Sequence, residues 1–296
     1  MKKFVILIPL FNDWKSVSKL ISEIDIQTLS WNANVSIVIV NDASTEEKAD
    51  FNPKFKKIDS IKILNMKENR VHQRCIAAGL KYICKNEEFD HVIVMDADGE
   101  DRPEELNDFL TKALENPMKT ITGNRFKRSE GLIFRILYEI HKLITLIFTG
   151  KLIKFGNFTC LTKDHVFRLI EKPYLWNSYS SSVIRAIDER ASISSVRGKR
   201  YVLPSKMNFF SLIFHSLTII SVFRNIVIVR SIIFLIIYFL VIFKNISLIN
   251  LVPVFFLLVF VSIILNISSR SNLDELNKSL DNISSIDTLR GFNSGQ

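Results

Sequence analysis

The fold of this chain is decided by the stretch Val92-Ile-Val-Met-Asp-Ala-Asp-Gly-Glu-Asp-Arg-Pro-Glu-Glu-Leu106, in which an apolar run meets a group of acids. Residues 92–95 are the kind of short apolar segment that forms a buried parallel strand. Four carboxylates follow it directly: Asp96, Asp98, Glu100 and Asp101. Pro103 then predicts the first turn of a helix. Open α/β sheets bind ligands where their strands end, so these acids are candidate binding residues, although a solvated turn before a helix uses the same residue types.

Strands and helices alternate along the first 125 residues. Apolar runs at residues 4–8, 35–40 and 61–64 predict three further strands. Helices are predicted between them, at residues 16–26 and 69–83. This alternation indicates an α/β fold with a mostly parallel sheet and helices on both faces.

The pattern is looser between residues 126 and 200. Residues 131–149 are rich in Leu, Ile and Phe, which fits either a core helix or a helix lying on a bilayer. Residues 155–158 predict a turn into another strand, and residues 191–196 suggest one more strand.

Two long apolar segments near the C-terminus predict a transmembrane hairpin. Residues 226–243 are apolar except for Arg230, whose long side chain can reach the interface, and residues 246–267 carry no charge. Only Lys244 and Asn245 separate them, so both ends of the hairpin should lie on one side of the membrane. Three arginines flank those ends, and this excess predicts a cytoplasmic location for that side: Arg224, Arg230 and Arg270.

These features divide the chain into four parts. We predict a cytoplasmic α/β domain at residues 1–205, an interfacial amphipathic helix at 206–225, a transmembrane hairpin at 226–268 and a polar tail at 269–296. The tail has Leu and Ile at rough helical spacing, and its sequence indicates no role.

Composition narrows the classes of partner. The 296 residues carry a formal charge of +9, which suits a membrane surface or an anionic substrate. Nucleic acid is the weakest candidate, since no nucleic-acid-binding module is evident. The three cysteines (Cys75, Cys84 and Cys160) lack metal-ligand spacing and indicate reduced thiols in a cytosolic domain.

Four motifs follow one another along the chain: Ile8-Pro-Leu-Phe-Asn12, Val40-Asn-Asp-Ala-Ser-Thr45, Asn69-Arg-Val-His-Gln-Arg-Cys-Ile-Ala-Ala-Gly79 and Met95-Asp-Ala-Asp-Gly-Glu-Asp-Arg-Pro-Glu-Glu105. In this order they resemble glycosyltransferase family 2, which has the GT-A fold. The late segment Arg200-Tyr-Val-Leu-Pro-Ser-Lys-Met-Asn208, followed by a hairpin, is similar to the polyprenyl-phosphate, dolichol-phosphate mannose synthase-like branch. The resemblance covers roughly residues 3 to 268.

This resemblance implies a sugar transfer from a nucleoside diphosphate sugar that depends on Mg or Mn. It makes Asp98 the main metal ligand and lets Asp96 contact the metal or the ribose. Glu100 falls where relatives carry Gln, and its carboxylate is a third candidate ligand. A metal held by such acids neutralises the diphosphate as it leaves.

The resemblance also places four residues around the donor nucleotide: Pro9, Asn12, Asp42 and Asn69. Asn41 replaces the first acid of the usual pair, and Val71 stands where relatives often have Gly. Strand-end turns and helix N-caps use the same residue types, so Asn69 is equally well explained as a helix N-cap.

Phosphate binding is implied for a set of basic residues. Arg125 would face the donor or acceptor phosphate and act in catalysis. Arg200, Ser205 and Lys206 match the late motif, which in relatives brackets the diphosphate and a lipid phosphate, although Leu203 replaces its glycine. Basic residues attracted to anionic lipid beside a membrane helix explain the same pattern.

We therefore predict a membrane-bound inverting glycosyltransferase that transfers a sugar to a polyprenyl phosphate. Asn157 carries an amide, which cannot act as a general base. A phosphate acceptor is already ionised and needs no general base. The first alternative is transfer to a hydroxyl of a lipid-linked glycan or glycolipid in cell-envelope synthesis, with Asp101, Asp164 or Asp188 as the base. A catalytically silent membrane scaffold is the second. A nucleotidyltransferase is a third, but its glycine-rich phosphate loop is missing near the first strand.

Overall fold

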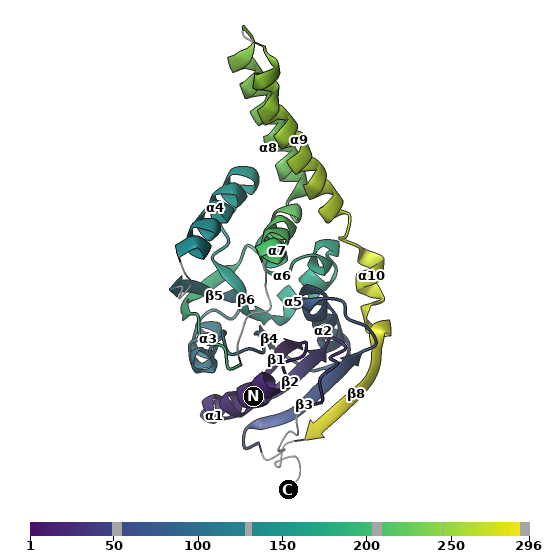
Figure 1. Ribbon diagram of the computed structural model, residues 1–296. Helices are drawn as coiled ribbons and strands as arrows, with labels where there is room; N and C mark the ends of the chain where they lie inside the picture. Colours follow the sequence, from purple (N-terminus) through teal and green to yellow (C-terminus); the bar gives the residue numbers. More distant parts are fainter. Residues whose placement is uncertain (49–54, 128–131, 203–208, 245, 291–296) are drawn as a thin grey trace. The chain divides into compact units, whose positions relative to one another are not determined.

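The computed structural model describes residues 1–48, 55–127, 132–202, 209–244 and 246–290 (Figure 1). The chain divides into two compact units. The first consists of Met1–Ser129, Lys154–Ser205 and Leu273–Gln296, and the second of Glu130–Ile153 and Lys206–Asn272. Each unit is described by itself.

The first unit is built on one eight-stranded sheet, in the order β7-β5-β6-β4-β1-β2-β3-β8. Its strands are β1 (Lys2–Leu10), β2 (Ala33–Asn41), β3 (Ile58–Met66), β4 (His91–Val94), β5 (Thr120–Lys127), β6 (Phe155–Thr162), β7 (Arg190–Val196) and β8 (Ile283–Arg290). The pairs among β1 to β4 are parallel, whereas β6 runs antiparallel to β4 and β5, and β8 antiparallel to β3. The predicted mostly parallel α/β sheet is confirmed.

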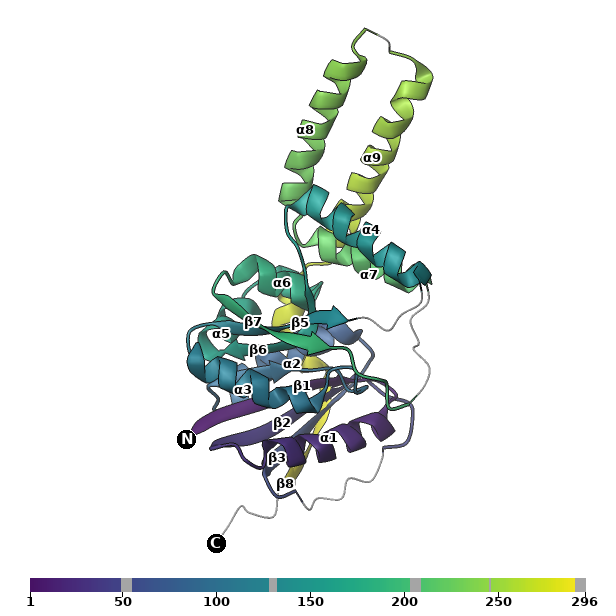
Figure 2. The same ribbon diagram turned by 90° about the vertical axis from the view of Figure 1, so that its left-hand side faces the viewer.

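Helices cover both faces of this sheet (Figure 2). They are α1 (Trp14–Thr28), α2 (His72–Asn86), α3 (Leu106–Glu115), α5 (Lys163–Ile170), α6 (Tyr179–Ala186) and α10 (Leu273–Asn277). Three short 3₁₀ turns join them: η1 (Pro103–Glu105), η2 (Pro173–Trp176) and η3 (Ser279–Asn282). Pro103 opens η1 at the first helical position, as the sequence predicts.

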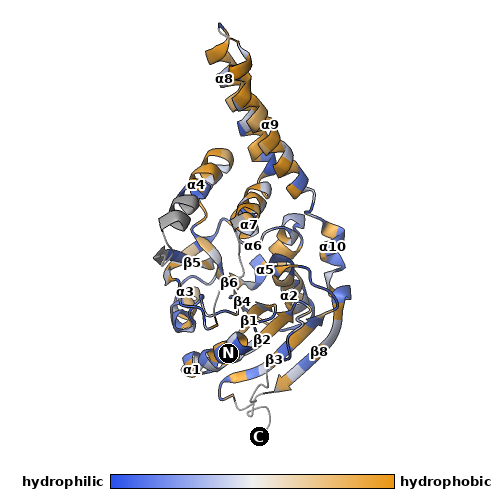
Figure 3. Ribbon diagram, viewed as in Figure 1, coloured by the Kyte–Doolittle hydropathy of each residue, from blue (hydrophilic) through white to orange (hydrophobic). Residues whose placement is uncertain are grey.

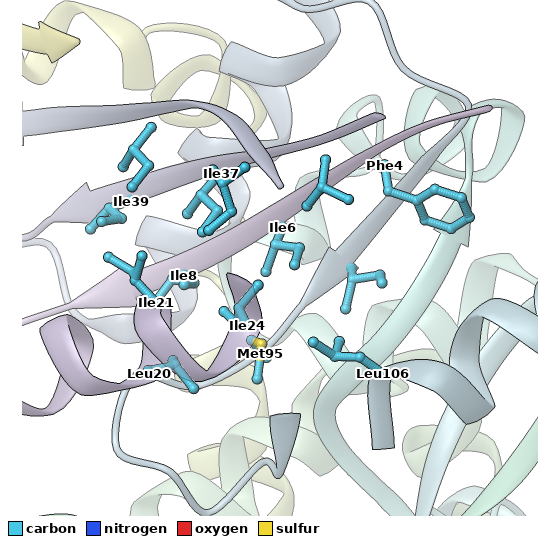
Figure 4. Close-up of a cluster of buried hydrophobic side chains, with 14 of the residues drawn as sticks. Phe4, Ile6, Ile8, Leu20, Ile21, Ile24, Ile37, Ile39, Met95 and Leu106 are labelled. Carbon is cyan, nitrogen blue, oxygen red and sulfur yellow. The ribbon is translucent and has the colours of Figure 1, made fainter. Parts of the chain in front are cut away.

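The main core lies between the sheet and α1 with α3. In α1 the apolar residues recur at helical spacing, so Leu20, Ile21 and Ile24 all face the sheet. Alternate residues of β1 point to the same side, among them Ile6 and Ile8 (Figure 4). The intervening Leu7 points toward α2, where Gly79 allows close approach: a Cβ there would lie 2.4 Å from a Leu7 methyl.

The second unit contains α4 (Leu132–Thr149), α7 (Phe209–Ser221), α8 (Arg224–Ile242) and α9 (Leu248–Ser268). By length and composition, α8 and α9 are each long and apolar enough to cross a membrane, and Figure 3 shows that most of their residues are hydrophobic. Near the tip of the hairpin, the Tyr238 hydroxyl donates to the Asn250 carbonyl at 2.8 Å. Arg230, for which the sequence suggests snorkelling, instead donates to the Ile147 carbonyl at the end of α4, at 2.8 Å.

The sequence-based boundaries need three local corrections. Residues 269–296, set apart above as a tail, contain α10 and β8, and β8 joins the sheet of the first unit. Residues 155–158 lie inside β6 and not in a turn before it. Arg125 lies within β5 and not after it.

Candidate active site

The carboxyl ends of β1, β2 and β4 lie at one edge of the sheet. Leu10 pairs with Asn41, and Leu7 pairs with Val94, so the segments that follow these strands leave from neighbouring positions. Two backbone hydrogen bonds extend the pairing beyond β2 and β4: Asp42 N–H to Leu10 O at 2.8 Å and Met95 N–H to Leu7 O at 3.1 Å. The loops that carry Asn12, Asp42 and Asp96 are therefore brought together by the strand register.

A tight acidic turn follows β4. Asp101 closes it by accepting the Asp96 N–H at 2.9 Å, and Asp98 accepts the Glu100 N–H at 2.9 Å. Gly99 at its centre has φ +83°, and a Cβ there would meet the ring of Tyr201. The turn therefore holds all four acids on one short segment.

A second segment, residues 197–202, packs directly on this turn. Its backbone donates from Gly198 to Glu100 O at 2.8 Å and from Tyr201 to Asp98 O at 3.0 Å. Arg200 forms an ion pair with Asp98 and donates through Nε to Glu100 at 3.1 Å. Arg197 donates through Nε to the other oxygen of Glu100 at 2.8 Å. Arg200, predicted to bind an acceptor phosphate, thus contacts two of the predicted metal ligands.

Burial gives the acids of the turn unequal pKa values. Asp98 is 9% exposed, and burial together with Asp96 and Glu100 raises its pKa. Burial likewise raises the pKa of Asp101 to about 7, helped by the charge of Asp96 and opposed by Arg125. Burial also acts on Asp96, but His72 outweighs it and lowers the pKa of Asp96. Asp96 is therefore the acid of this group most strongly held in its charged form.

Asp96 is the centre of a polar network. His72 Nε2 lies 3.1 Å from Asp96 Oδ1, and Asn157 Nδ2 donates to the same oxygen at 3.0 Å. Burial disfavours the protonated His72, but the charge and hydrogen bond of Asp96, together with the charges of Asp98 and Asp101, raise the pKa of His72. The sequence predicts no role for His72, and the structure pairs it with a predicted metal ligand. Its position inside the motif that begins at Asn69 is a sequence signal that could have drawn attention to it.

Arg125 lies on the other side of the acidic turn. Its Nη2 is 3.4 Å from Asp101 Oδ1, and Asp101 is 2% exposed. Gly156 in β6 gives the guanidinium room, since a Cβ there would lie 3.3 Å from Nη2. Arg125 thus lies beside the acidic turn, and its described partner is a carboxylate.

Polar side chains join the loop after β1 to the loop after β2. Asn12, with φ +49°, accepts the N–H groups of Thr45 at 2.7 Å and Glu46 at 3.2 Å. Pro9 lies in β1 opposite Val40, at the base of these loops. The predicted nucleotide-binding residues of these two strands therefore form one connected surface.

Asp42 is 2% exposed, and its carboxylate binds the backbone of the loop that precedes α2. Its two oxygens accept the N–H groups of Arg70 at 2.7 Å and Val71 at 2.9 Å. Asn69 also accepts the Val71 N–H, at 3.1 Å. Because α2 begins at His72, Asn69 lies outside the helix and is not its N-cap. Val71 has φ +76°, a conformation suited to the glycine that the family pattern carries there.

Four predicted residues are not among those described at this site. Ser205 and Lys206 fall outside the described residues, as does Leu203. Asp164, a candidate base, follows Thr162, which pairs with His91 at the start of β4, so it lies at the opposite edge of the sheet. Asp188 precedes β7 at that same opposite edge, where Arg190 pairs with Thr120.

Comparisons with known proteins agree with this arrangement. The model of the family described as Glycosyl transferase family 2 matches residues 5–178. A glucosyl-3-phosphoglycerate synthase from Mycobacterium tuberculosis, solved with Mn²⁺, UDP-glucose and phosphoglyceric acid, is similar with a TM-score of 0.54 at 11% identity. That match covers 76% of this chain and 80% of the other.

A mannosyl-3-phosphoglycerate synthase from Rubrobacter xylanophilus is similar with a TM-score of 0.54 at 14% identity, over 75% of this chain and 72% of the other. At such identities these structures show a shared fold alone, which is GT-A-like. The family model covers more than half of the chain and carries the assignment further. This protein therefore belongs to glycosyl transferase family 2 and is a glycosyltransferase.

Proposed function

We propose that this glycosyltransferase is membrane-bound and moves a sugar from a nucleoside diphosphate sugar to a polyprenyl phosphate, with inversion at the anomeric carbon. The observation that carries the proposal is that Arg197 and Arg200 form ion pairs with acids of the turn. The same chain has two apolar helices of membrane-spanning length. Guanidinium groups bind phosphates bidentately. Apolar helices hold an enzyme at the bilayer, where a lipid substrate is found.

We infer that Asp96, Asp98 and Glu100 hold a divalent cation, Mg or Mn. Their oxygens are the hard ligands that such cations prefer, and these acids lie close along one turn. Among the described residues, no three His, Cys, Asp or Glu side chains are arranged to hold a metal ion. Arg200 and Arg197 instead neutralise Asp98 and Glu100. Cation binding therefore requires Arg200 to release Asp98. A bound cation would stabilise the negative charge of the departing diphosphate.

In this proposal, Arg200 binds the acceptor phosphate after it has released Asp98. Its guanidinium and that of Arg197 lie at the acidic turn, where an acceptor phosphate must approach the sugar. Asn157 is engaged with Asp96 and His72 and carries no basic oxygen. Asp101 is buried against Arg125 and the Asp96 amide. An acceptor that is already ionised suits this site, because it needs no proton removed.

The second unit supports membrane attachment. Besides α8 and α9, its shorter helices expose apolar side chains: Ile140, Leu143, Leu146 and Ile147 on α4, and Phe210, Ile213 and Phe214 on α7. Such faces suit the interface between lipid and water. We propose that the catalytic unit faces the cytoplasm, because arginines flank the open end of the hairpin and only Lys244 lies at its tip.

The decisive experiment uses the full chain in lipid nanodiscs. A panel of nucleotide sugars is supplied with Mg or Mn, with and without polyprenyl phosphate, and release of nucleoside diphosphate is measured. Release that needs one donor and the lipid phosphate is the expected result. Release that ignores the lipid phosphate would move the acceptor to a hydroxyl of a glycan or glycolipid. A folded protein that releases nothing would favour the scaffold interpretation.

Two variants test the residues. Asp98→Ala should abolish turnover in protein that remains folded, whereas Asp164→Ala, an acid at the opposite edge of the sheet, should leave turnover unchanged. Arg200→Ala should raise the KM for the acceptor more than the KM for the donor. Retained activity in Asp98→Ala would exclude the metal role. Equal effects on the KM for the acceptor and the KM for the donor would indicate that Arg200 has only a general electrostatic role.

A further inference from the structure

The segment that follows the hairpin returns to the sheet beside the loops of the proposed donor site. Strand β8 runs antiparallel along β3, and Ser285 pairs with Asn65 near the carboxyl end of β3 (Figure 1). This is the edge at which β1 and β2 also end, because Asn65 pairs in turn with Asn41. Residues 281–287 therefore lie next to the segments that carry Asp42 and Asn69.

One chain of side-chain hydrogen bonds leads from β8 to the loop after β1. Asn65 Nδ2 donates to Ser285 Oγ at 3.0 Å, and Asn41 Nδ2 donates to Asn65 Oδ1 at 3.0 Å. Asn41 Oδ1 then accepts the Ser44 N–H at 3.1 Å. Ser44 Oγ accepts the Asn12 N–H at 2.9 Å. Asn41, which replaces an acid of the family pattern, thus joins the C-terminal strand to the predicted nucleotide loop.

An ion pair also joins β8 to the segment that follows β2. Lys48 Nζ lies 2.5 Å from Asp287 Oδ2, and this contact, followed by a hydrogen bond from Asn65, lowers the pKa of Asp287. Both side chains are more than a third exposed, so the pair alone contributes little to stability. The pair joins Lys48, in the segment after β2, to β8.

The loop between β3 and α2 receives a separate set of contacts from the same segment. Lys67 N–H donates to the Asn282 carbonyl at 2.7 Å, and Lys67 Nζ donates to the Asp281 carbonyl at 2.6 Å. Asn282 Nδ2 donates back to the Glu68 carbonyl at 3.1 Å. This loop ends in Arg70 and Val71, whose N–H groups bind Asp42.

We propose that residues 281–287 belong to the donor-binding site as positioning residues that hold these two loops for the nucleoside diphosphate. The inference rests on the proposed function and specifies which part of the donor depends on them. Both loops carry predicted nucleotide-binding residues, and both are bound by one segment that follows the hairpin: Asp281 and Asn282 at the end of η3 contact one loop, and residues 285 and 287 of β8 are linked to the other. Without these contacts the loops are less ordered before the nucleotide binds. Binding must then order them, and this lowers the affinity for the nucleotide.

The test measures binding of UDP and GDP, each with Mn²⁺, to the full chain in nanodiscs by titration calorimetry. Asn65→Ala removes the hydrogen bonds with both Asn41 and Ser285, and Ser285→Ala removes the hydrogen bond from Asn65. Each variant should weaken binding of the preferred nucleotide by about fivefold. Ser285→Thr keeps the hydroxyl and should restore wild-type affinity. Thr288→Ala, an exposed residue of the same strand paired with Lys62, is the matched control and should bind like the wild type.

The kinetic readout separates positioning from general stability. Asn65→Ala and Ser285→Ala should raise the KM for the donor while kcat and the KM for the acceptor stay within about twofold of wild type. A lower melting temperature with unchanged nucleotide affinity would overturn the inference, as would equal effects in Thr288→Ala. A wild-type protein that binds no nucleoside diphosphate would also overturn it. Nucleotide binding without turnover would refute the proposed function alone, since the variants would still report on the loops.

Discussion

Replacement of Val71 by glycine should stabilise the protein. Val71 has φ +76° and ψ 147°, a region of backbone conformation that is open to glycine and strained for a β-branched residue. Such strain costs about 1–3 kcal/mol. Glycine loses about 0.5–1 kcal/mol through the greater freedom of the unfolded chain. The side chain is 60% exposed, so little packing is lost. The net gain is about 1 kcal/mol.

For a catalytic unit of this size, a gain of 1 kcal/mol raises the melting temperature by about 2–4 °C. The assay is thermal unfolding of the detergent-solubilised protein, followed by tryptophan fluorescence at one scan rate for all variants. Val71→Ala is the matched control: it keeps a Cβ and therefore most of the strain, and should melt within about 1 °C of the wild type. A Val71→Gly variant that melts below Val71→Ala would refute the assignment of strain to this residue.

Three further changes have predictable effects. Asp42→Ala removes the buried carboxylate that accepts two partly buried N–H groups and should cost about 3 kcal/mol, whereas Asp42→Asn keeps one acceptor and should cost less; chemical denaturation of both variants measures the difference. Asp25→Ala removes the acceptor of three N–H groups (Lys56, Lys57 and Ile58) and should lower the melting temperature by several degrees. Burial lowers the pKa of His91 to about 4, so the folded state binds fewer protons than the unfolded state between pH 6.5 and 4. Stability should therefore fall as pH drops through that window, by at most about 3 kcal/mol, and His91→Phe should flatten the pH profile.

The catalytic fold was predictable because its strands and helices have local signals. The helix from Trp14 shows apolar residues at helical spacing, and β4 is an uninterrupted apolar run before its acids. Strand β8 was missed for a physical reason. Its apolar residues recur every third position, at Ile283, Ile286 and Leu289, which suggests a helix. Pairing with β3 across a long separation in sequence outweighs that pattern, and no local propensity encodes such pairing.

The sequence predicts which residue types form the candidate site and at which edge of the sheet they lie. It does not predict which groups those side chains contact. The order of strands fixes where Asp96 and Asp42 emerge, but it does not say that Asp42 binds the backbone of Arg70 and Val71. In the same way, the ion pair of Arg200 with Asp98 joins residues about 100 positions apart. Such contacts depend on how loops close over one another, and polar side chains at a strand end have several partners within reach.

The late position of β8 also has a consequence for biosynthesis. Asn65 and its partner Ser285 are separated by 220 residues, and the whole apolar hairpin lies between them in the chain. At about 5–20 residues per second, a ribosome needs roughly 10–40 seconds to add that length. During this interval β3 is an open sheet edge, which is a template for mispairing. Nascent chains of this protein should therefore depend on chaperones until the edge strand arrives.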